Sequence, residues 1–127
     1  TGDTQLTFSQ EIKMDGAIIV STPQEVALLD VKRGIKMFDK LGVKVLGLVD
    51  NMSCFTGDDG KKYKIFGEGG VERTAKEFNK DFLGEIPINP EVGKYGDLGI
   101  PIVEKNSNHE ISKIYLSLAQ KIKDLYI

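Results

Sequence analysis

The sequence lacks the features that mark several classes of protein. Lysine and arginine total 17 against 19 acidic residues, so the formal net charge is -2 and no basic stripe indicates a nucleic-acid binder. We find no secretory signal, and no apolar run reaches the roughly 18 residues that a membrane span needs. We therefore expect a cytoplasmic protein with neither a nucleic-acid nor a membrane partner.

Cysteine and histidine are almost absent. Cys54 is the single cysteine, which excludes an intramolecular disulfide and fits a reducing compartment. His109 is the single histidine, and it stands beside an acidic residue where the last helix is expected to begin. We expect Cys54 to be a partly buried apolar residue and His109 to be a surface or helix-capping residue, so the sequence predicts no metal ligands.

A phosphate-binding loop is also missing from the 127 residues. No Gly-x-x-x-x-Gly-Lys-Ser/Thr pattern occurs, and Gly67-Glu-Gly-Gly70 is not followed by the required lysine. That glycine run is better interpreted as a turn that leads into a helix. Because this loop stabilises the charge of the β- and γ-phosphates, we do not expect the chain by itself to hydrolyse ATP.

Two apolar segments with an amphipathic helix between them predict a right-handed βαβ unit. Residues 17–20 and 43–49 are expected to be strands, and 17–20 and 46–49 are expected to be the central ones, because their near-continuous apolar character suits strands covered on both faces. Thr22-Pro23-Gln24-Glu25 predicts the helix start, with a capping threonine and a proline at the first helical position. Gly42 is expected to end this helix.

The rest of the chain predicts a third parallel strand and further helices. The remaining expected elements are a short segment from Asp3 to Gln10, a hairpin over 55–65, a short helix over 71–78, a strand over 82–86, a loop with one helical turn over 90–102, and an amphipathic helix over 111–125 that packs on the sheet. The fold class is therefore α/β, a parallel sheet with flanking helices plus a short β-hairpin, in one domain.

Asn51 is expected to be the first residue past the strand that contains the apolar run 43–49, and only Asp50 stands between that run and Asn51. Ligands of open parallel sheets bind outside the carboxyl ends of the strands. The amide of Asn51 offers two donors and an acceptor, so it could read the edge of a purine base. The alternative is an asparagine that bonds its own backbone in a turn.

Several short motifs occur in an order found in one protein family. They are Thr1-Gly-Asp-Thr-Gln-Leu-Thr7, Asp15-Gly-Ala-Ile-Ile-Val-Ser-Thr-Pro-Gln24, Asn51-Met-Ser53, Ile65-Phe-Gly-x-Gly-Gly70, Leu83-Gly-Glu-Ile-Pro87 and Asp97-Leu-Gly-Ile-Pro-Ile102. Together they resemble the Mrp/ApbC family of MinD-like P-loop ATPases that carry iron–sulfur clusters. The resemblance spans nearly the whole chain and implies the second half of a P-loop ATPase domain, either as a truncated gene or as an expressed fragment.

The resemblance implies functional residues and partners. Asp3 resembles the aspartate that closes the second switch loop, a catalytic role in the intact parent. Asn51 and Met52 would contact adenine, with Pro87 and Ile88 as an apolar wall against the base. The parent would bind ATP and Mg²⁺, hydrolyse ATP, act as a homodimer and deliver clusters to iron–sulfur client proteins.

The chain departs from the family at the cluster ligands. The Cys-x-x-Cys that follows Asn-Met-Ser in cluster-binding members falls on Gly57 and Gly60 here, so the ligand pair is absent. We therefore expect no bridging cluster. Two alternative functions stay open: a MinD-like positioning ATPase, and a non-catalytic dimerisation or interaction module.

Overall fold

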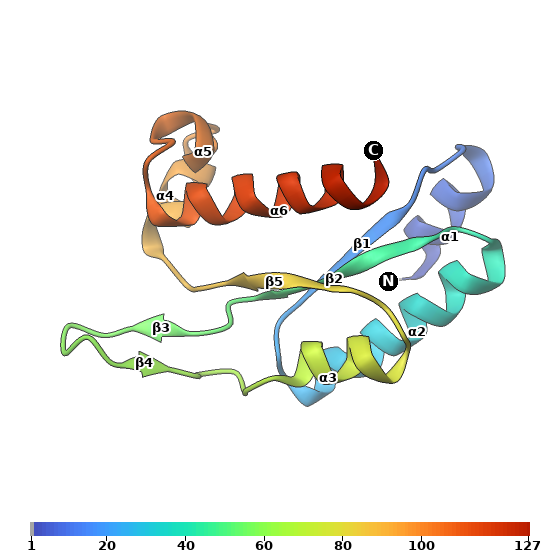
Figure 1. Ribbon diagram of the computed structural model, residues 1–127, viewed down its shortest axis with the longest axis horizontal. Helices are drawn as coiled ribbons and strands as arrows, with labels where there is room; N and C mark the ends of the chain where they lie inside the picture. The colour runs from blue at the N-terminus through green and yellow to red at the C-terminus, as the bar shows by residue number, and fades with distance from the viewer. Residues whose placement is uncertain (1) are drawn as a thin grey trace.

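The computed structural model describes residues 2–127, arranged in three layers (Figure 1). A parallel sheet lies in the middle, with α2 and α3 on one face and α6 on the other. The α/β class and the parallel sheet that the sequence predicts are confirmed. The elements are α1 Gly2–Glu11, β1 Ala17–Ser21, α2 Glu25–Leu41, β2 Val45–Asn51, β3 Phe55–Thr56, β4 Lys62–Tyr63, α3 Gly70–Glu77, β5 Phe82–Ile86, α4 Pro90–Asp97, α5 Ile102–Lys105 and α6 Glu110–Tyr126.

The three parallel strands run in the order β1, β2, β5, so β2 alone is central among the described residues. The prediction that 17–20 would also be a central strand is wrong here, because β1 pairs only with β2. Its apolar character does not mean burial on both faces: Ile18 is 39% exposed and Val20 is 56% exposed. These two side chains lie on the α6 side of the sheet, since Ile19 between them packs on the α2 side.

The start of α2 differs from its predicted start. The helix begins at Glu25, and Gln24 is the N-cap residue without a side-chain hydrogen bond. Thr22 does not cap the helix, because its hydroxyl contacts Gln24 Oε1 at 3.1 Å. The proline therefore precedes the helix instead of occupying its first position. The predicted end is confirmed: Gly42 is the C-cap in the left-handed region, with φ of 74°.

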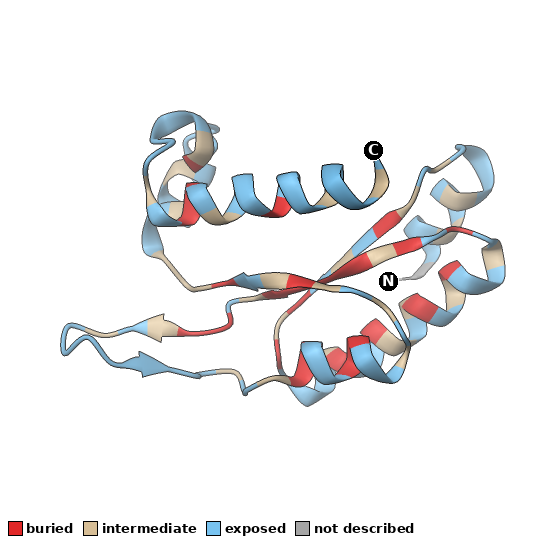
Figure 2. Cartoon of the chain, in the orientation of Figure 1, coloured by how far each residue is buried: buried red, intermediate tan, exposed pale blue. Residues whose placement is uncertain are grey.

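The two faces of the sheet carry separate cores (Figure 2). On the α2 and α3 side, Ile35, Leu48 and Val71 have no exposed surface. On the α6 side, Leu83 of β5 and Ile111 of α6 itself are buried between the sheet and the helix. Leu48 belongs to the first core and Val49 to the second, so successive residues of β2 point to opposite faces.

Two further predictions need correction. Residues 90–102 are not a loop with one helical turn, because α4 fills 90–97 and α5 begins at Ile102. Asn89 Oδ1 accepts a hydrogen bond from the Glu91 amide, and Pro90 follows at the first helical position, a strong start signal. Asn51 is the last residue of β2 instead of the first residue beyond it.

The hairpin, the third strand and the final helix form as predicted. β3 and β4 pair antiparallel and project from the sheet (Figure 1), β5 covers 82–86, and α6 packs on it. Within residues 2–127, no helix combines the length and the apolar character that crossing a bilayer requires.

Candidate functional site

The candidate site lies where β2 and β5 end. Asn51 and Ile86 are register partners at the last step of the ladder. The pairing continues beyond both strands, because the Ser53 amide donates to Ile86 O at 3.1 Å and the Ile88 amide donates to Cys54 O at 2.7 Å. The segments 51–54 and 86–88 therefore run side by side. Four of the predicted site residues, Asn51, Met52, Pro87 and Ile88, come together at this end of the sheet.

Exposure at this place suits contact with a ligand. Met52 is 44% exposed, and Asn51, Pro87 and Ile88 are half-buried. Among the described residues, the side-chain amide of Asn51 has no hydrogen-bond partner in the protein, so the turn-type bond to its own backbone is not formed. Its donors and acceptor are thus free for an external group.

Met52 holds an unusual backbone conformation. Its φ is 56°, and only one other non-glycine residue among 2–127, Asn79, has a positive φ. For a residue with a Cβ, the left-handed conformation costs about 1–2 kcal/mol of free energy. This turn redirects the chain between Asn51 and Ser53 so that the Ser53 amide reaches β5. Strain of this kind is often found at ligand sites.

Asp50 was not predicted as a functional residue, yet it has the most unusual environment on this side of the sheet. It is 2% exposed, and its Oδ1 atom is buried without a hydrogen-bond partner among the described residues. Burial, together with the charge of Glu85, raises the pKa of Asp50 to about 6, and the charge of Lys64 acts in the opposite direction. The signal that could have identified it is a charged residue directly after the apolar run Leu46–Val49 and before Asn51.

The hairpin tip is closed by side-chain hydrogen bonds. Asp59 Oδ1 accepts from the Lys61 amide at 2.9 Å, and Asp59 Oδ2 accepts from the Tyr63 hydroxyl. The bond from Tyr63 holds the pKa of Asp59 below its usual range. No described group of three or more His, Cys, Asp or Glu side chains could hold a metal ion. Cys54 is 5% exposed, as expected for a buried apolar residue.

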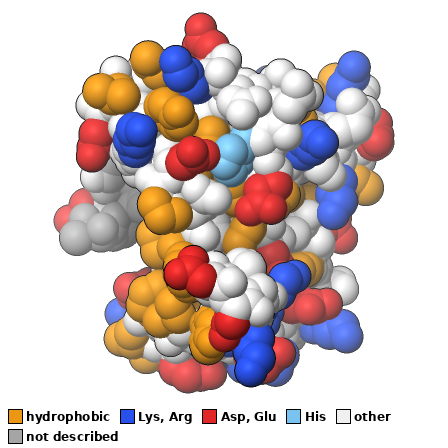
Figure 3. Space-filling view, turned by 90° about the vertical axis from the view of Figure 1, so that its left-hand side faces the viewer, with side chains coloured by type: hydrophobic (Ala, Val, Ile, Leu, Met, Phe, Trp, Pro, Cys, Tyr) orange, Lys and Arg blue, Asp and Glu red, His pale blue; other side chains and the backbone are white. Residues whose placement is uncertain are grey.

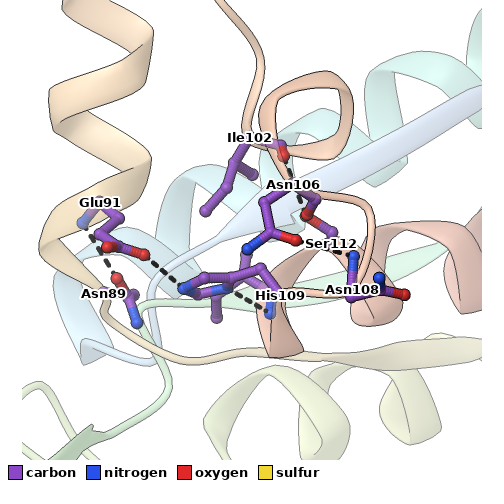
Figure 4. Close-up of polar contacts among 8 residues, drawn as sticks. Asn89, Glu91, Ile102, Asn106, Asn108, His109 and Ser112 are labelled. Carbon is purple, nitrogen blue, oxygen red and sulfur yellow. Dashed lines mark hydrogen bonds and ion pairs between the residues drawn. The ribbon is translucent and has the colours of Figure 1, made fainter.

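His109 caps α6, one of the two roles that the sequence predicts for it. Its Nδ1 accepts a hydrogen bond from the Ile111 amide at 3.1 Å, and its Nε2 lies 2.6 Å from Glu91 Oε2 (Figure 4). An accepting Nδ1 carries no proton, so this geometry selects the Nε2–H tautomer. The contact to Glu91 was not predicted, since it joins residues of α4 and α6. In Figure 3 the single histidine lies at the surface between acidic side chains.

Ser112 joins α6 to the segment 102–106 through its buried side chain. Its hydroxyl lies 2.6 Å from Asn106 O and 3.1 Å from Ile102 O, and the side chain has no exposed surface (Figure 4). Asn89, which caps α4, directly follows Ile88. The helices α4, α5 and α6 are thereby tied to the chain that leaves β5.

Asp3 does not join the other candidate residues. It lies in the first turn of α1, which sits beside the amino ends of the strands (Figure 1). Its side chain is exposed. Asn51 and Pro87 lie at the opposite, carboxyl ends of β2 and β5. The described chain thus brings together the four residues predicted to contact adenine and leaves Asp3 apart from them.

Comparison with solved structures defines the class of protein. The fold matches that of the cell division ATPase MinD from Pyrococcus furiosus with a TM-score of 0.68 at 23% identity, over 87% of this chain and 43% of that one. A nucleotide-binding protein from Archaeoglobus fulgidus, solved in complex with ADP, matches with a TM-score of 0.67 at 40% identity, over 77% of this chain and 41% of that one. The fold is that of a MinD-like P-loop NTPase.

The chain belongs to the ParA family of NUBPL iron-transfer P-loop NTPases, which matches residues 1–123. It is 46% identical, over 96% of its length, to the iron–sulfur protein required for NADH dehydrogenase, mitochondrial, of Arabidopsis thaliana. It is 45% identical, again over 96%, to the iron–sulfur cluster carrier protein of Synechocystis. It spans 39% and 35% of the lengths of these two relatives. The family resemblance predicted from the motifs is confirmed.

Proposed function

We propose that this chain is part of an ATP-binding iron–sulfur cluster carrier and that the carboxyl ends of β2 and β5 contact the adenine. The observation that carries this proposal is the pairing of 51–54 with 86–88, which places a free amide beside an apolar wall. Asn51 would bond the edge of the base, while Met52, Pro87 and Ile88 would contact its face. Support also comes from a relative solved with ADP.

The test is ATP affinity in the intact protein. Asn51→Ala should weaken binding by about 1–3 kcal/mol, or roughly 5- to 150-fold, because the adenine edge would lose a buried polar partner. Asn108→Ala is a matched control, since it removes an exposed amide that lies outside the paired segments. If both variants bind ATP with the same affinity as the unsubstituted intact protein, Asn51 does not contact the adenine.

Residues outside this chain would supply the phosphate and Mg²⁺ contacts of the intact protein. The chain itself has no phosphate-binding loop, so we expect it to show no ATPase activity alone. Asp3 would take its proposed switch role only if α1 were rearranged so that it approached the strand ends. A MinD-like positioning role is less well supported, because the two relatives described above, at 46% and 45% identity, are named as an iron–sulfur protein and an iron–sulfur cluster carrier protein, whereas the likeness to MinD is one of fold.

Cluster carriage by this chain would require ligands from elsewhere. The hairpin presents Gly57 and Gly60, and its tip is already closed by Asp59. Anaerobic reconstitution with iron and sulfide should therefore leave the purified chain colourless. Four iron atoms per dimer that are lost in Cys54→Ser would show that the buried thiol is a ligand after all.

A homodimer is the proposed working unit. Ile18 and Val20 form an exposed apolar strip on an edge strand, and such surfaces recruit another chain. Sedimentation velocity at micromolar concentration should show a dimer or larger species that Val20→Lys weakens. Leu29→Lys is the control, because Leu29 is exposed to a similar degree, 57%, on α2. A monomeric unsubstituted chain would contradict the proposal.

A cytoplasmic location stays a prediction, since one relative is named mitochondrial.

A further inference from the structure

A groove of about 310 Å³ lies between β5 and α6, the helix that crosses above this strand (Figure 1). Its floor is apolar, with Leu83 from β5 and with Ile114 and Leu118 from α6. Lys113 and Lys121 line the groove as exposed side chains of α6. Among residues 2–127, neither lysine forms an ion pair with an acidic side chain. The groove therefore combines an apolar floor with two uncompensated positive charges.

The groove runs along a free edge of the described sheet, because β5 has β2 as its one strand partner there. Backbone groups of successive residues in a strand point to opposite edges. Ile86 O and the Ile88 amide are used on the β2 side, so the backbone groups of Glu85 point to the free edge. Leu83 O is occupied by a side chain, since it accepts a hydrogen bond from Lys121 Nζ at 2.9 Å.

Lys121 thus takes the place of a neighbouring strand at Leu83 O. Sheets commonly protect an exposed edge with lysine. Gly84 permits the close approach of α6: its φ is 147°, and a Cβ there would lie 3.3 Å from Leu118 Cδ2. The ammonium group stands on a flexible stem. A backbone N–H can therefore replace it at Leu83 O, and the lysine then keeps its charge for another partner.

We propose that this groove binds an extended acidic peptide of another protein, which adds a strand to the free edge of β5. A backbone N–H of the peptide takes over Leu83 O, and other peptide groups bond the backbone of Glu85. Lys121 is released to pair with a peptide carboxylate. Because β1 forms the opposite edge of the sheet, the proposal depends neither on the adenine contact nor on the dimer proposed above.

The spacing of the two lysines defines the peptide. Lys113 and Lys121 stand eight positions apart on α6, about 12 Å along the helix axis. Side chains four positions apart in an extended strand lie on one face, about 13 Å from each other. The matching pattern is acid-x-apolar-x-acid, with the apolar side chain over Ile114 and Leu118. Glu85 also lines the groove, so an acid beside it would be repelled and a uniformly acidic peptide is disfavoured.

Peptide binding to the whole chain tests the proposal. The probe is a fluorescein-labelled peptide with the core Glu-Thr-Val-Thr-Glu, and its affinity is measured by fluorescence anisotropy. A peptide of the same composition with the core Glu-Glu-Thr-Val-Thr should bind at least fivefold more weakly, because its acids no longer match the two lysines. N-methylation of alternate backbone amides tests strand addition: one alternate set should weaken binding at least tenfold, and the other should change it less than twofold.

Hydrogen exchange locates the added strand. At saturating probe, protection of the Glu85 amide should rise at least tenfold, because this amide gains a backbone partner. The Ala17 amide, bonded to Lys44 O on the other edge strand, is the internal control and should not change. Protection of the Glu85 amide that rises with protein concentration in the absence of peptide would show that a second copy of the chain occupies the edge, and would overturn the proposal.

Two variants separate the groove from the general charge of α6. Lys113→Gln should weaken probe binding at least threefold. Lys123→Gln removes an exposed lysine of α6 outside the groove and should leave binding unchanged. Both substitutions change exposed side chains, so both variants should fold. The proposal is overturned if the probe does not bind, if the two peptides of equal composition bind equally, if the Glu85 amide gains no protection, or if Lys113→Gln behaves like Lys123→Gln.

Discussion

The central strand β2 is covered differently on its two faces. On one face α2 and α3 bury Leu48 completely and extend the core across to Ile19 on β1. On the other face α6 covers Val49 and β5 but leaves Ile18 and Val20 of β1 exposed. The same parallel sheet is therefore closed on one side and half open on the other. The position of the covering helix, and not the character of the strand, decides where apolar side chains are buried.

The largest expected effect is on the closed face. Ile35→Ala should destabilise the chain by about 2–5 kcal/mol, because the side chain has no exposed surface and its removal leaves a cavity among rigid neighbours. Chemical denaturation monitored by circular dichroism measures the loss. A loss below about 1 kcal/mol would show that the closed core relaxes freely.

A second test overpacks the face beneath α6. A Cβ at Gly47 would lie 2.5 Å from Leu83 Cγ and 2.9 Å from Asp81 O, so Gly47→Ala forces β2 and β5 apart. We expect a destabilisation of about 1–3 kcal/mol in thermal or urea unfolding. Gly93→Ala is the control, since no atom lies within 4 Å of a Cβ there. Equal stability of the two variants would show that β2 and β5 are not closely packed at Gly47.

The pH dependence of unfolding extends the comparison to Asp50, a buried acidic residue on the closed face. Because burial raises its folded-state pKa to about 6 from 3.8, the folded state binds the proton more tightly. The contribution of Asp50 to stability is therefore fully present below about pH 4 and is lost as the pH rises to about 6. Urea unfolding between pH 4 and pH 8 should show this slope, and Asp50→Asn should flatten it.

The contacts that join α4 to α6 are expected to contribute less to the stability of the chain. His109→Ala removes the cap on the Ile111 amide and the contact with Glu91, so we expect a loss of about 1 kcal/mol. His109→Asn should restore part of it, because asparagine is a good N-cap residue but cannot reach Glu91 in the same way. In a thermal melt the asparagine variant should lie between the parent chain and the alanine variant.

The smallest effect is expected on the open face. Val20→Thr should change the stability of the monomer by less than about 0.5 kcal/mol, since the side chain is 56% exposed. Denaturation at low protein concentration is the measurement. A larger loss would mean that Val20 is covered in solution, and the proposed dimer would be the first explanation to examine.

Several features were readable from the sequence alone because they depend on neighbours along the chain. The helical spacing of α2 and α6, the apolar runs of β2 and β5, and the turn Gly57-Asp-Asp-Gly60 each have a local physical cause. The same holds for the cap at Gly42 and for Asn51 at a strand end. Asn89-Pro90 was an equally local signal for α4 that the prediction did not use.

Tertiary structure alone decided which of these elements meet. An apolar run looks the same in an edge strand and a central one, so the order β1, β2, β5 and the exposure of Val20 could not be deduced. The contact of His109 with Glu91 joins two helices. The burial of Asp50 depends on helices distant in sequence, which cover one face of β2. Sequence periodicity states which side of an element is apolar, whereas the free energy of a buried charge depends on everything packed around it.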